Sequence, residues 1–174
     1  VDERNERITT PGEVGYIARI GNIPLGYYKD EEKTARTFPV MADGTRISVL
    51  GDMGYEEEDG SIVFLGRGSQ CINTGGEKVY AEEVEAVLHA HPAIADALVV
   101  PVPDPKFGQR VGAVAKVAEG FDEPSLEDVQ EHCRASLAGY KVPRTVIFVD
   151  EVKRTPAGKA DYKWAKVAAD SANV

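Results

Sequence analysis

The sequence CINTGGEKVYAEEVEAVLHA, residues 71–90, contains the signals of a β-hairpin followed by a helix. Gly75-Gly76 predicts a tight turn, because it separates two short runs rich in β-forming residues. Val84, Val87 and Leu88 recur at helical spacing, and the pattern stops before His91-Pro92. The expected elements are strands at 71–74 and 77–80 and a helix at 81–90.

Downstream of this stretch, further strands alternate with helices. The predicted elements are strands at 94–102 and 111–117, a helix from Ser125 to Gly139, a strand at 145–149 and a terminal helix from about Asp161. Ser125 to Asp128 has the pattern of a capping box, which predicts the start of the middle helix. Its buried face is predicted from four residues at helical spacing, Leu126, Val129, Cys133 and Leu137. This order of elements predicts a compact α+β domain.

Upstream of residue 67, strand and turn signals dominate. The predicted elements are strands at 13–20, 45–50 and 61–65 and a short helix over 30–36 with Asp30 as its N-cap. Asp59-Gly60, between two apolar runs, predicts a hairpin. We therefore expect a small β-rich unit over residues 1–67 and the α+β domain over residues 68–174.

Composition excludes several classes of protein. The chain has 174 residues with 29 acidic and 20 basic side chains, a net charge of −9, which disfavours binding along nucleic acid or to an anionic membrane surface. No apolar run approaches the roughly 20 residues of a spanning helix. Cys71 and Cys133 lack metal-site spacing, so we expect reduced thiols in a cytosolic protein and no metal site. The chain starts at Val1 without a signal peptide pattern, and we expect it to be part of a longer protein.

Four local patterns carry candidate chemistry, and their order along the chain matters more than any one of them. They are GYYKDEEKT at 26–34, the pair Gly51-Asp52 followed by Asp59-Gly60 and Gly66-Arg67, NTGGEKVY at 73–80 with the acidic helix start behind it, and RTPAGK at 154–159.

In this order and spacing the four patterns resemble the C-terminal motifs of the adenylate-forming superfamily, which includes acyl-CoA synthetases, luciferases and peptide-synthetase adenylation domains. The run GRGSQCINTGGEK, residues 66–78, is most similar to CoA ligases of actinobacteria that act on fatty acids and steroid side chains. The resemblance implies a barrel-like subdomain that closes a large N-terminal domain over residues 1–67, and a mobile C-terminal α+β domain over residues 68–174.

The resemblance implies a nucleotide site at Asp52 and Arg67. A carboxylate can accept hydrogen bonds from both hydroxyls of a ribose, and a guanidinium offers several donors to a hydroxyl or phosphate. We expect Asp52 at the end of a strand and Arg67 just after one. The alternatives are a turn aspartate that accepts backbone amides and an arginine in a surface salt bridge.

Two further roles follow from the resemblance. Ser69 takes the position of the hinge about which the C-terminal domain swings, where the family usually has Asp or Lys; a small residue still permits the rotation. Gly75, Gly76 and Glu77 take the position of the path used by the pantetheine arm of coenzyme A. Since glycine lacks a Cβ, the backbone there can approach a ligand closely, but a simple tight turn explains the two glycines equally well.

Lys159 is the predicted catalytic residue. It follows Pro156-Ala157-Gly158, on a loop that can be delivered into a site and withdrawn. An ammonium group that bridges a carboxylate and the α-phosphate of ATP offsets the repulsion between the two anions, and the resemblance implies this role. A solvated lysine near a helix start is the alternative.

The implied reaction joins a small-molecule carboxylic acid to coenzyme A through an acyl-adenylate, with Mg²⁺ and ATP consumed and AMP and pyrophosphate released. In the family, the phosphate-binding loop, the adenine-contacting strand and the acyl pocket all precede the C-terminal motifs that this chain carries. We therefore expect the chain to be inactive without the missing N-terminal domain. Two alternatives stay open. One is an adenylation domain that serves a carrier protein, and the other is a binding module that kept the fold without the chemistry.

Overall fold

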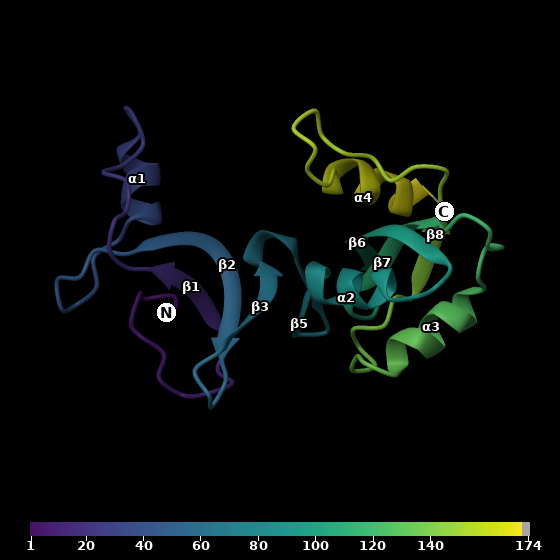
Figure 1. Ribbon diagram of the computed structural model, residues 1–174, viewed down its shortest axis with the longest axis horizontal. Coiled ribbons are helices and arrows are strands. Elements are labelled where there is room, and N and C mark those ends of the chain that lie inside the picture. The colour runs from purple at the N-terminus through teal and green to yellow at the C-terminus, as the bar shows by residue number, and fades with distance from the viewer. Residues whose placement is uncertain (172–174) are drawn as a thin grey trace. The chain divides into compact units, whose positions relative to one another are not determined.

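The structure, a computed structural model, describes residues 1–171 and divides the chain into two compact units, Val1–Ser69 and Gln70–Val174 (Figure 1). The sequence places this division between Arg67 and Gly68. Residues 172–174 of the predicted second domain lie outside the described residues.

The first unit is built on a three-stranded antiparallel sheet of order β1-β2-β3. Its elements are β1 (Gly15–Arg19), α1 (Glu31–Thr37), β2 (Ser48–Glu56) and β3 (Ile62–Arg67). The side chain of Asp30 caps α1 by accepting a hydrogen bond from the amide of Lys33 at 2.9 Å, as the sequence predicts. At the β2–β3 turn, the carboxylate of Asp59 accepts the amide of Ser61 at 2.8 Å. The unit is β-rich, and its described strands form an open sheet.

One strand of this unit is longer than predicted. The sequence predicts a strand over 45–50 that ends before Asp52, but β2 runs on to Glu56. Gly51 has a φ of 92°, and the register with β3 shifts between Met53 and Gly54. These irregularities allow the strand to bend and continue, because a bulge adds twist without ending the pairing. Asp52 therefore lies inside a strand, not at its end.

The second unit contains a five-stranded sheet of order β5-β4-β7-β6, with β8 paired in parallel to β7. Its elements, after a short 3₁₀ turn η1 (Gly68–Gln70), are β4 (Cys71–Thr74), β5 (Glu77–Tyr80), α2 (Ala81–His89), β6 (Ile94–Asp104), β7 (Gly108–Val117), α3 (Leu126–Arg134), β8 (Thr145–Phe148) and α4 (Tyr162–Ser171). The predicted α+β class is confirmed. No helix within residues 1–171 combines the length and apolar character that crossing a bilayer requires.

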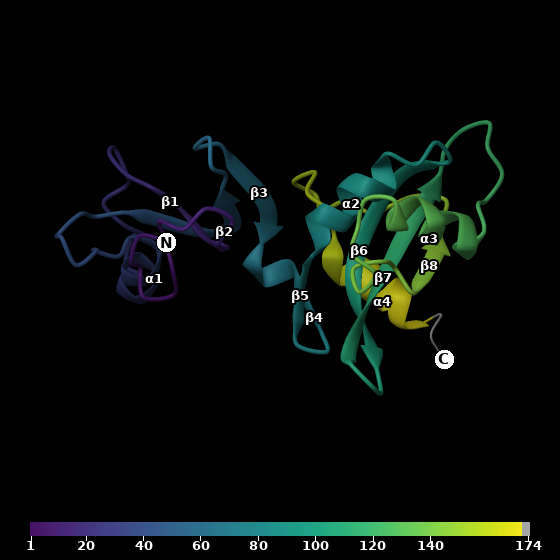
Figure 2. The same cartoon turned by 90° about the horizontal axis from the view of Figure 1, so that it is seen from below.

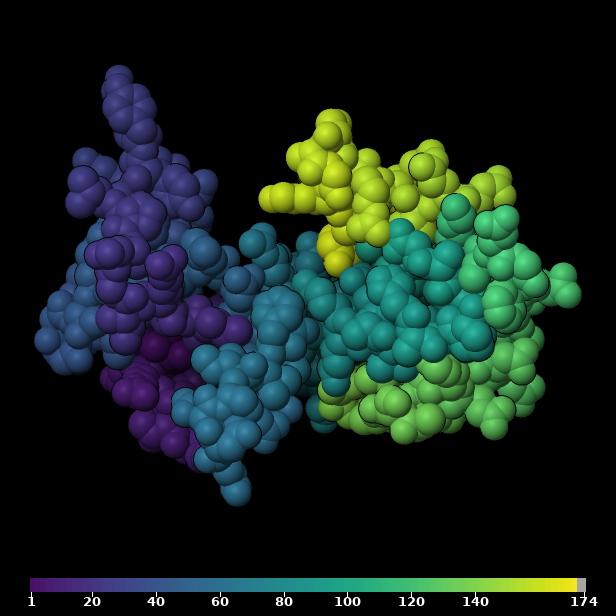
Figure 3. All heavy atoms as spheres, viewed as in Figure 1, coloured from purple at the N-terminus to yellow at the C-terminus, as the bar shows by residue number. Residues whose placement is uncertain are grey.

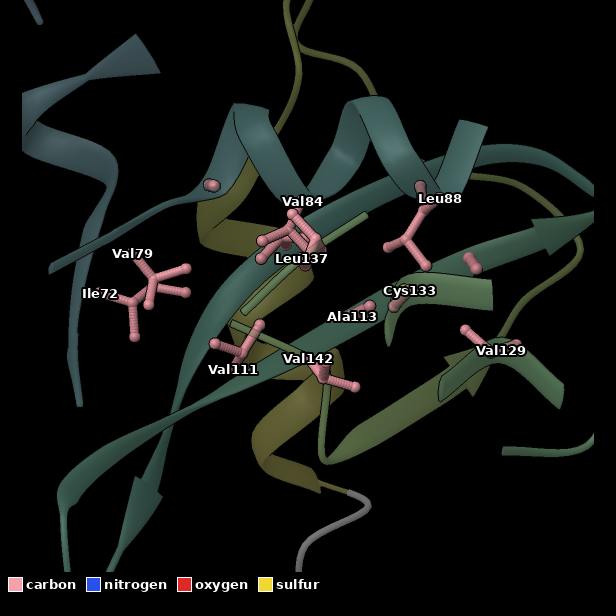
Figure 4. Packing of buried hydrophobic residues seen from close by; sticks show 14 of the residues in the cluster. Ile72, Val79, Val84, Leu88, Val111, Ala113, Val129, Cys133, Leu137 and Val142 are labelled. Carbon is pink, nitrogen blue, oxygen red and sulfur yellow. The ribbon is translucent and has the colours of Figure 1, made fainter. Parts of the chain in front are cut away.

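Helices cover both faces of this sheet (Figures 1 and 2). Alternate residues of β6 point to opposite faces, as pleating requires: Ala97 and Val99 pack with α2 and α3, whereas Leu98 and Val100 pack with α4. Figure 4 shows Val84 of α2 among the packed residues of the first face. The sheet and its two helical layers thus form the body on which the loops of the second unit are held.

Helix α3 begins as predicted but ends earlier. Its capping box is present, since Ser125 and Asp128 each accept the backbone amide of the other. The helix ends at Arg134, not Gly139, because the amides of Ala135 and Ser136 bond carbonyls three residues back, as in a 3₁₀ turn. Leu126 is 42% exposed and does not belong to the buried face, whereas Leu137 is buried in the turn that follows.

Candidate nucleotide and thioester site

Asp52 and Arg67 lie opposite each other on β2 and β3. The guanidinium Nε of Arg67 donates to Oδ1 of Asp52 at 3.2 Å, with side-chain exposures of 57% and 33%. Arg67 is the last residue of β3, not the residue after the strand. The structure therefore brings the two predicted nucleotide residues together in one exposed pair. The pair offers a negative acceptor and a positive donor at the same point of the sheet.

Ser69 is exposed and lies in the 3₁₀ turn η1, where the chain divides into its two units. No strand ladder runs through this turn, so its backbone dihedrals are not fixed by sheet pairing.

Gly75 and Gly76 form the turn between β4 and β5, with φ angles of 62° and 93°. Both glycines and the following Glu77 are exposed. The amide of Gly75 donates to the carbonyl of Phe107 at 3.0 Å, and a Cβ on Gly75 would lie 3.0 Å from Cδ1 of that ring. The turn is thus fixed against the tip of the β6–β7 hairpin.

Gln109 adds a second contact between these two turns. Its Oε1 accepts the amide of Asn73 at 3.0 Å. The sequence alone gave no physical account of Phe107 and Gln109. Both residues lie in a Pro/Gly-rich loop between two apolar strands, which is a weak sign of a functional loop. The turn that they contact, between β4 and β5, lies more than 30 residues earlier in the sequence, so the contact itself is not predictable from the loop.

Lys159 lies on a tight exposed turn between β8 and α4. Its carbonyl accepts the amide of Thr155 at 2.7 Å, and the carbonyl of Thr155 accepts the amide of Gly158 at 2.8 Å. Gly158 has a φ of 76°, which favours glycine at this point of the turn. Within residues 1–171 the ammonium of Lys159 makes no hydrogen bond or ion pair. Figure 3 shows the segment before α4, in yellow, standing out from the surface of the second unit.

The hollows and the cysteines within residues 1–171 add no further residues to this site. Two hollows in the first unit, of about 340 and 520 Å³, include neither Asp52 nor Arg67 in their lining. Across residues 1–171, no group of three or more His, Cys, Asp or Glu side chains is arranged to hold a metal ion. The thiols of Cys71 and Cys133 are both free, and burial raises the pKa of the Cys133 thiol to about 11.

Comparison with known families finds a match within the second unit. The family model "AMP-binding enzyme C-terminal domain" matches residues 83–159, from the start of α2 to Lys159. The match covers most of the second unit and none of the first. The matched region thus includes the Lys159 turn and the strands β6, β7 and β8 that precede it.

Two curated relatives that match most of the chain are named CoA ligases. A medium/long-chain-fatty-acid–CoA/3-oxocholest-4-en-26-oate–CoA ligase of Mycobacterium tuberculosis is 56% identical over 165 residues, 95% of this chain and 30% of the relative. A 3-oxocholest-4-en-26-oate–CoA ligase of Rhodococcus rhodochrous is 55% identical, over 95% of this chain and 29% of the relative. The chain therefore spans about 30% of the length of the curated relatives it matches.

A solved structure agrees with these matches. The o-succinylbenzoate CoA synthetase of Bacillus subtilis, in complex with an acyl-adenylate intermediate, matches with a TM-score of 0.80 and 30% identity, over 93% of this chain and 32% of that chain. The resemblance to acyl-CoA synthetases that the motifs predict is confirmed.

Proposed function

We propose that this chain is the C-terminal part of an ATP-dependent, AMP-forming acid–CoA ligase. One observation carries the proposal: 56% identity to a CoA ligase over 95% of the chain, a match that includes both Asp52 and Lys159 in its length. The substrates are a carboxylic acid, ATP with Mg²⁺, and coenzyme A. Fatty and steroid side-chain acids are the first to test, because the relatives carry those names.

The reaction has two steps. A carboxylate oxygen forms a bond to the α-phosphorus of ATP. The bond between the α-phosphorus and the oxygen that bridges it to the β-phosphorus breaks, and pyrophosphate leaves with that oxygen. The thiol of coenzyme A then loses its proton and attacks the acyl carbon, and the bond to the AMP oxygen breaks. The products are the thioester and AMP.

Lys159 serves the first step. Two anions approach each other there, and negative charge grows on the phosphate oxygens in the transition state. An ammonium that bridges the carboxylate and the α-phosphate stabilises this charge more than it stabilises the separate reactants. The exposed turn and the absence of any competing contact for this ammonium within residues 1–171 support the role. Mg²⁺ bound to ATP would offset part of the phosphate charge in this step.

Asp52 and Arg67 hold the nucleotide sugar. Asp52 accepts ribose hydroxyls while Arg67 fixes the carboxylate, and the one-third exposure of Asp52 supports access for a ligand. Ser69 is the hinge at which the AMP-binding C-terminal domain rotates between the two steps. Gly75, Gly76 and Glu77 then line the path of the pantetheine arm.

The acceptor is coenzyme A and not a carrier protein, since the mycobacterial and rhodococcal relatives are both named CoA ligases. The cytoplasm, which supplies ATP and coenzyme A, is the proposed location. The acid pocket and the remaining ATP contacts belong to the missing N-terminal domain of the same ligase. We therefore expect residues 1–174 alone to make neither adenylate nor thioester, and AMP formation by this chain with ATP, coenzyme A and a panel of acids would contradict this.

Lys159→Ala in the full-length ligase tests the proposal. We expect acid-dependent ATP–pyrophosphate exchange to fall by at least about a hundredfold, because one fixed charge in such a site contributes roughly 3 kcal/mol. Thioester formation from supplied acyl-adenylate should be largely kept. Lys163→Ala, on the exposed side of α4, is the matched control and should leave both steps intact. Exchange that survives in Lys159→Ala would show that the ammonium is not used.

A further inference from the structure

The free edge of β6 is unusual because side chains, not another strand, satisfy its amides. In the described sheet β6 pairs only with β7, so the amides of its other side need acceptors. The amide of Val99 donates to Oε1 of Glu85 at 2.8 Å. The amide of Ala97 donates to Oδ1 of Asp96 at 2.9 Å and to Nε2 of His89 at 3.0 Å. Side chains from α2 and β6 therefore cap this edge.

The same two carboxylates also bind the segment that carries Lys159. The hydroxyl of Tyr162 donates to Oε2 of Glu85 at 3.1 Å, and the guanidinium of Arg154 donates to Oδ2 of Asp96 at 2.5 Å. Each carboxylate thus holds an edge amide through one oxygen and the Lys159 segment through the other. Arg154 precedes the Lys159 turn and Tyr162 follows it, so the turn is fixed at both ends.

The Glu85 contact is shielded from water. Glu85 is only 8% exposed, and burial raises the pKa of its carboxyl. Burial and the nearby Glu85 charge also raise the pKa of Tyr162 well above its usual range, so its hydroxyl remains a donor at every physiological pH. A hydrogen bond in such surroundings is stronger and more directional than one on the surface.

The turn itself cannot fix where the Lys159 ammonium points. Its described internal bonds are local, between residues 155 and 159, and they leave the direction of the whole turn to the residues that flank it. An isolated bridge between Arg154 and Ala160 closes the base of the turn. Val152 and Ala160, on either side of the turn, pack into the apolar core of the unit. The contacts of Arg154 with Asp96 on β6 and of Tyr162 with Glu85 on α2 add two polar anchors that hold the turn on the body of the unit.

We propose that the Asp96–Arg154 and Glu85–Tyr162 contacts are a two-point clamp that positions Lys159 for the adenylation step. This inference rests on the proposed function, because it assigns the clamp a purpose through Lys159. Arg154 and Tyr162 are positioning residues that need not touch the nucleotide. A displacement of about 1 Å in a reacting group is enough to cost roughly a hundredfold in rate, so such a clamp has a kinetic effect even where it adds little stability.

Tyr162→Phe and Arg154→Met in the full-length ligase test the clamp. Each is expected to lower acid-dependent ATP–pyrophosphate exchange by about tenfold or more through kcat, with thioester formation from supplied acyl-adenylate unchanged. Amide hydrogen exchange at Thr155 and Gly158 should become faster, because the turn loses one of its two anchors. Arg154→Lys, which keeps a charged donor for Asp96, should retain most of the activity that Arg154→Met loses.

Lys166→Met is the matched control for a purely structural effect. Lys166 lies on α4 and bonds the Pro101 carbonyl at 3.2 Å and the Asp170 carboxylate, away from the clamp. This variant should lower thermal stability while it leaves adenylation and the exchange of the turn amides unchanged. Loss of adenylation in Lys166→Met to the same degree as in Tyr162→Phe would overturn the clamp, since any weakening of α4 would then suffice.

The Lys159→Ala variant separates the two proposals. If Lys159→Ala loses adenylation while Tyr162→Phe and Arg154→Met keep it, the clamp is overturned and the proposed function stands. If Lys159→Ala keeps adenylation, the role of Lys159 fails first and the clamp has nothing to position. Loss of adenylation in all three, with faster amide exchange only in the two clamp variants, supports both proposals.

Discussion

Gly75 is the residue at which an unusual backbone angle and a close contact coincide. Its φ of 62° suits glycine, and a Cβ would lie 3.0 Å from the ring of Phe107. Gly76 has a φ of 93° but nothing within 4 Å of its Cβ position. Substitution of Gly76 therefore measures the free-energy cost of the backbone angle alone. Substitution of Gly75 measures that cost together with the cost of the contact with Phe107.

We expect Gly75→Ala to lower the unfolding free energy of the second unit by about 2 kcal/mol, and Gly76→Ala by about 1 kcal/mol. Urea unfolding followed by the fluorescence of Trp164, the only tryptophan of the chain, measures both. Adding Phe107→Ala should reduce the extra cost at Gly75 by removing the ring. Equal costs for the two glycines, with no coupling to Phe107, would contradict the contact.

A second prediction at this scale concerns the charge of Glu85. Its folded-state pKa is raised by burial, so the stability that this group contributes is fully present when it is protonated and is lost as pH rises through the raised value. Glu82 and His89 face the same carboxyl with opposite effects on its pKa. As pH rises above the ordinary range of a glutamate carboxyl and through the raised value, Glu85→Gln should therefore become more stable relative to the wild type.

Urea unfolding at several pH values, monitored through Trp164, tests this. Glu127→Gln, at an exposed position of α3, is the matched control for the Glu-to-Gln substitution itself. If the stability difference between Glu85→Gln and the wild type stays constant with pH, the pKa of Glu85 is the same in the folded and unfolded states, and the prediction is wrong.

At the scale of elements, the capping box of helix α3, which the sequence predicts, can be tested directly. Ser125 and Asp128 accept each other's backbone amides, both at 3.1 Å. Ser125→Ala removes one acceptor, and we expect the second unit to lose about 1 kcal/mol of unfolding free energy. Ser125→Asn, which keeps an acceptor for the helix N-terminus, should recover most of the loss. Thermal or urea unfolding is the measurement, and equal stability of Ser125→Ala and wild type would rule out the cap as a stabilising feature.

Elements whose cause is local were predictable, whereas those set by distant partners were not. The cap of α3, the Gly75-Gly76 turn and the apolar run of β6 depend on residues within a few positions of one another. The true length of β2 depends on its pairing with β3 across a bulge, so the position of Asp52 inside a strand could not be deduced from residues 45–52.

The same reason limits prediction of the site. Lys159 was identifiable from its own motif, and the structure places it on an exposed turn. The contact between Glu85 and Tyr162 joins residues 77 positions apart, and nothing near either residue in the sequence signals the other. The supports of a functional loop are therefore harder to predict than the loop itself.

At the scale of the whole molecule, Ser69 provides the decisive test of the proposed rotation. It lies in the 3₁₀ turn at which the chain divides, where no ladder fixes its dihedrals. A rotation between two steps of one reaction requires at least one residue there to change φ or ψ, and proline fixes φ near −65°. We expect Ser69→Pro in the full-length ligase to keep one half-reaction, either ATP–pyrophosphate exchange or thioester formation from acyl-adenylate, and to lower the other by at least about tenfold.

Ser69→Ala is the matched control, because it also removes the hydroxyl but leaves φ free, and it should support both half-reactions. The thermal unfolding of each unit should be the same in the two variants, since the turn lies outside both hydrophobic cores of the second unit. If Ser69→Pro carries out both half-reactions at the rates of Ser69→Ala, then the backbone at this residue does not move between the steps. The rotation would have to be absorbed elsewhere, and the structural division between Ser69 and Gln70 would be a boundary without a hinge.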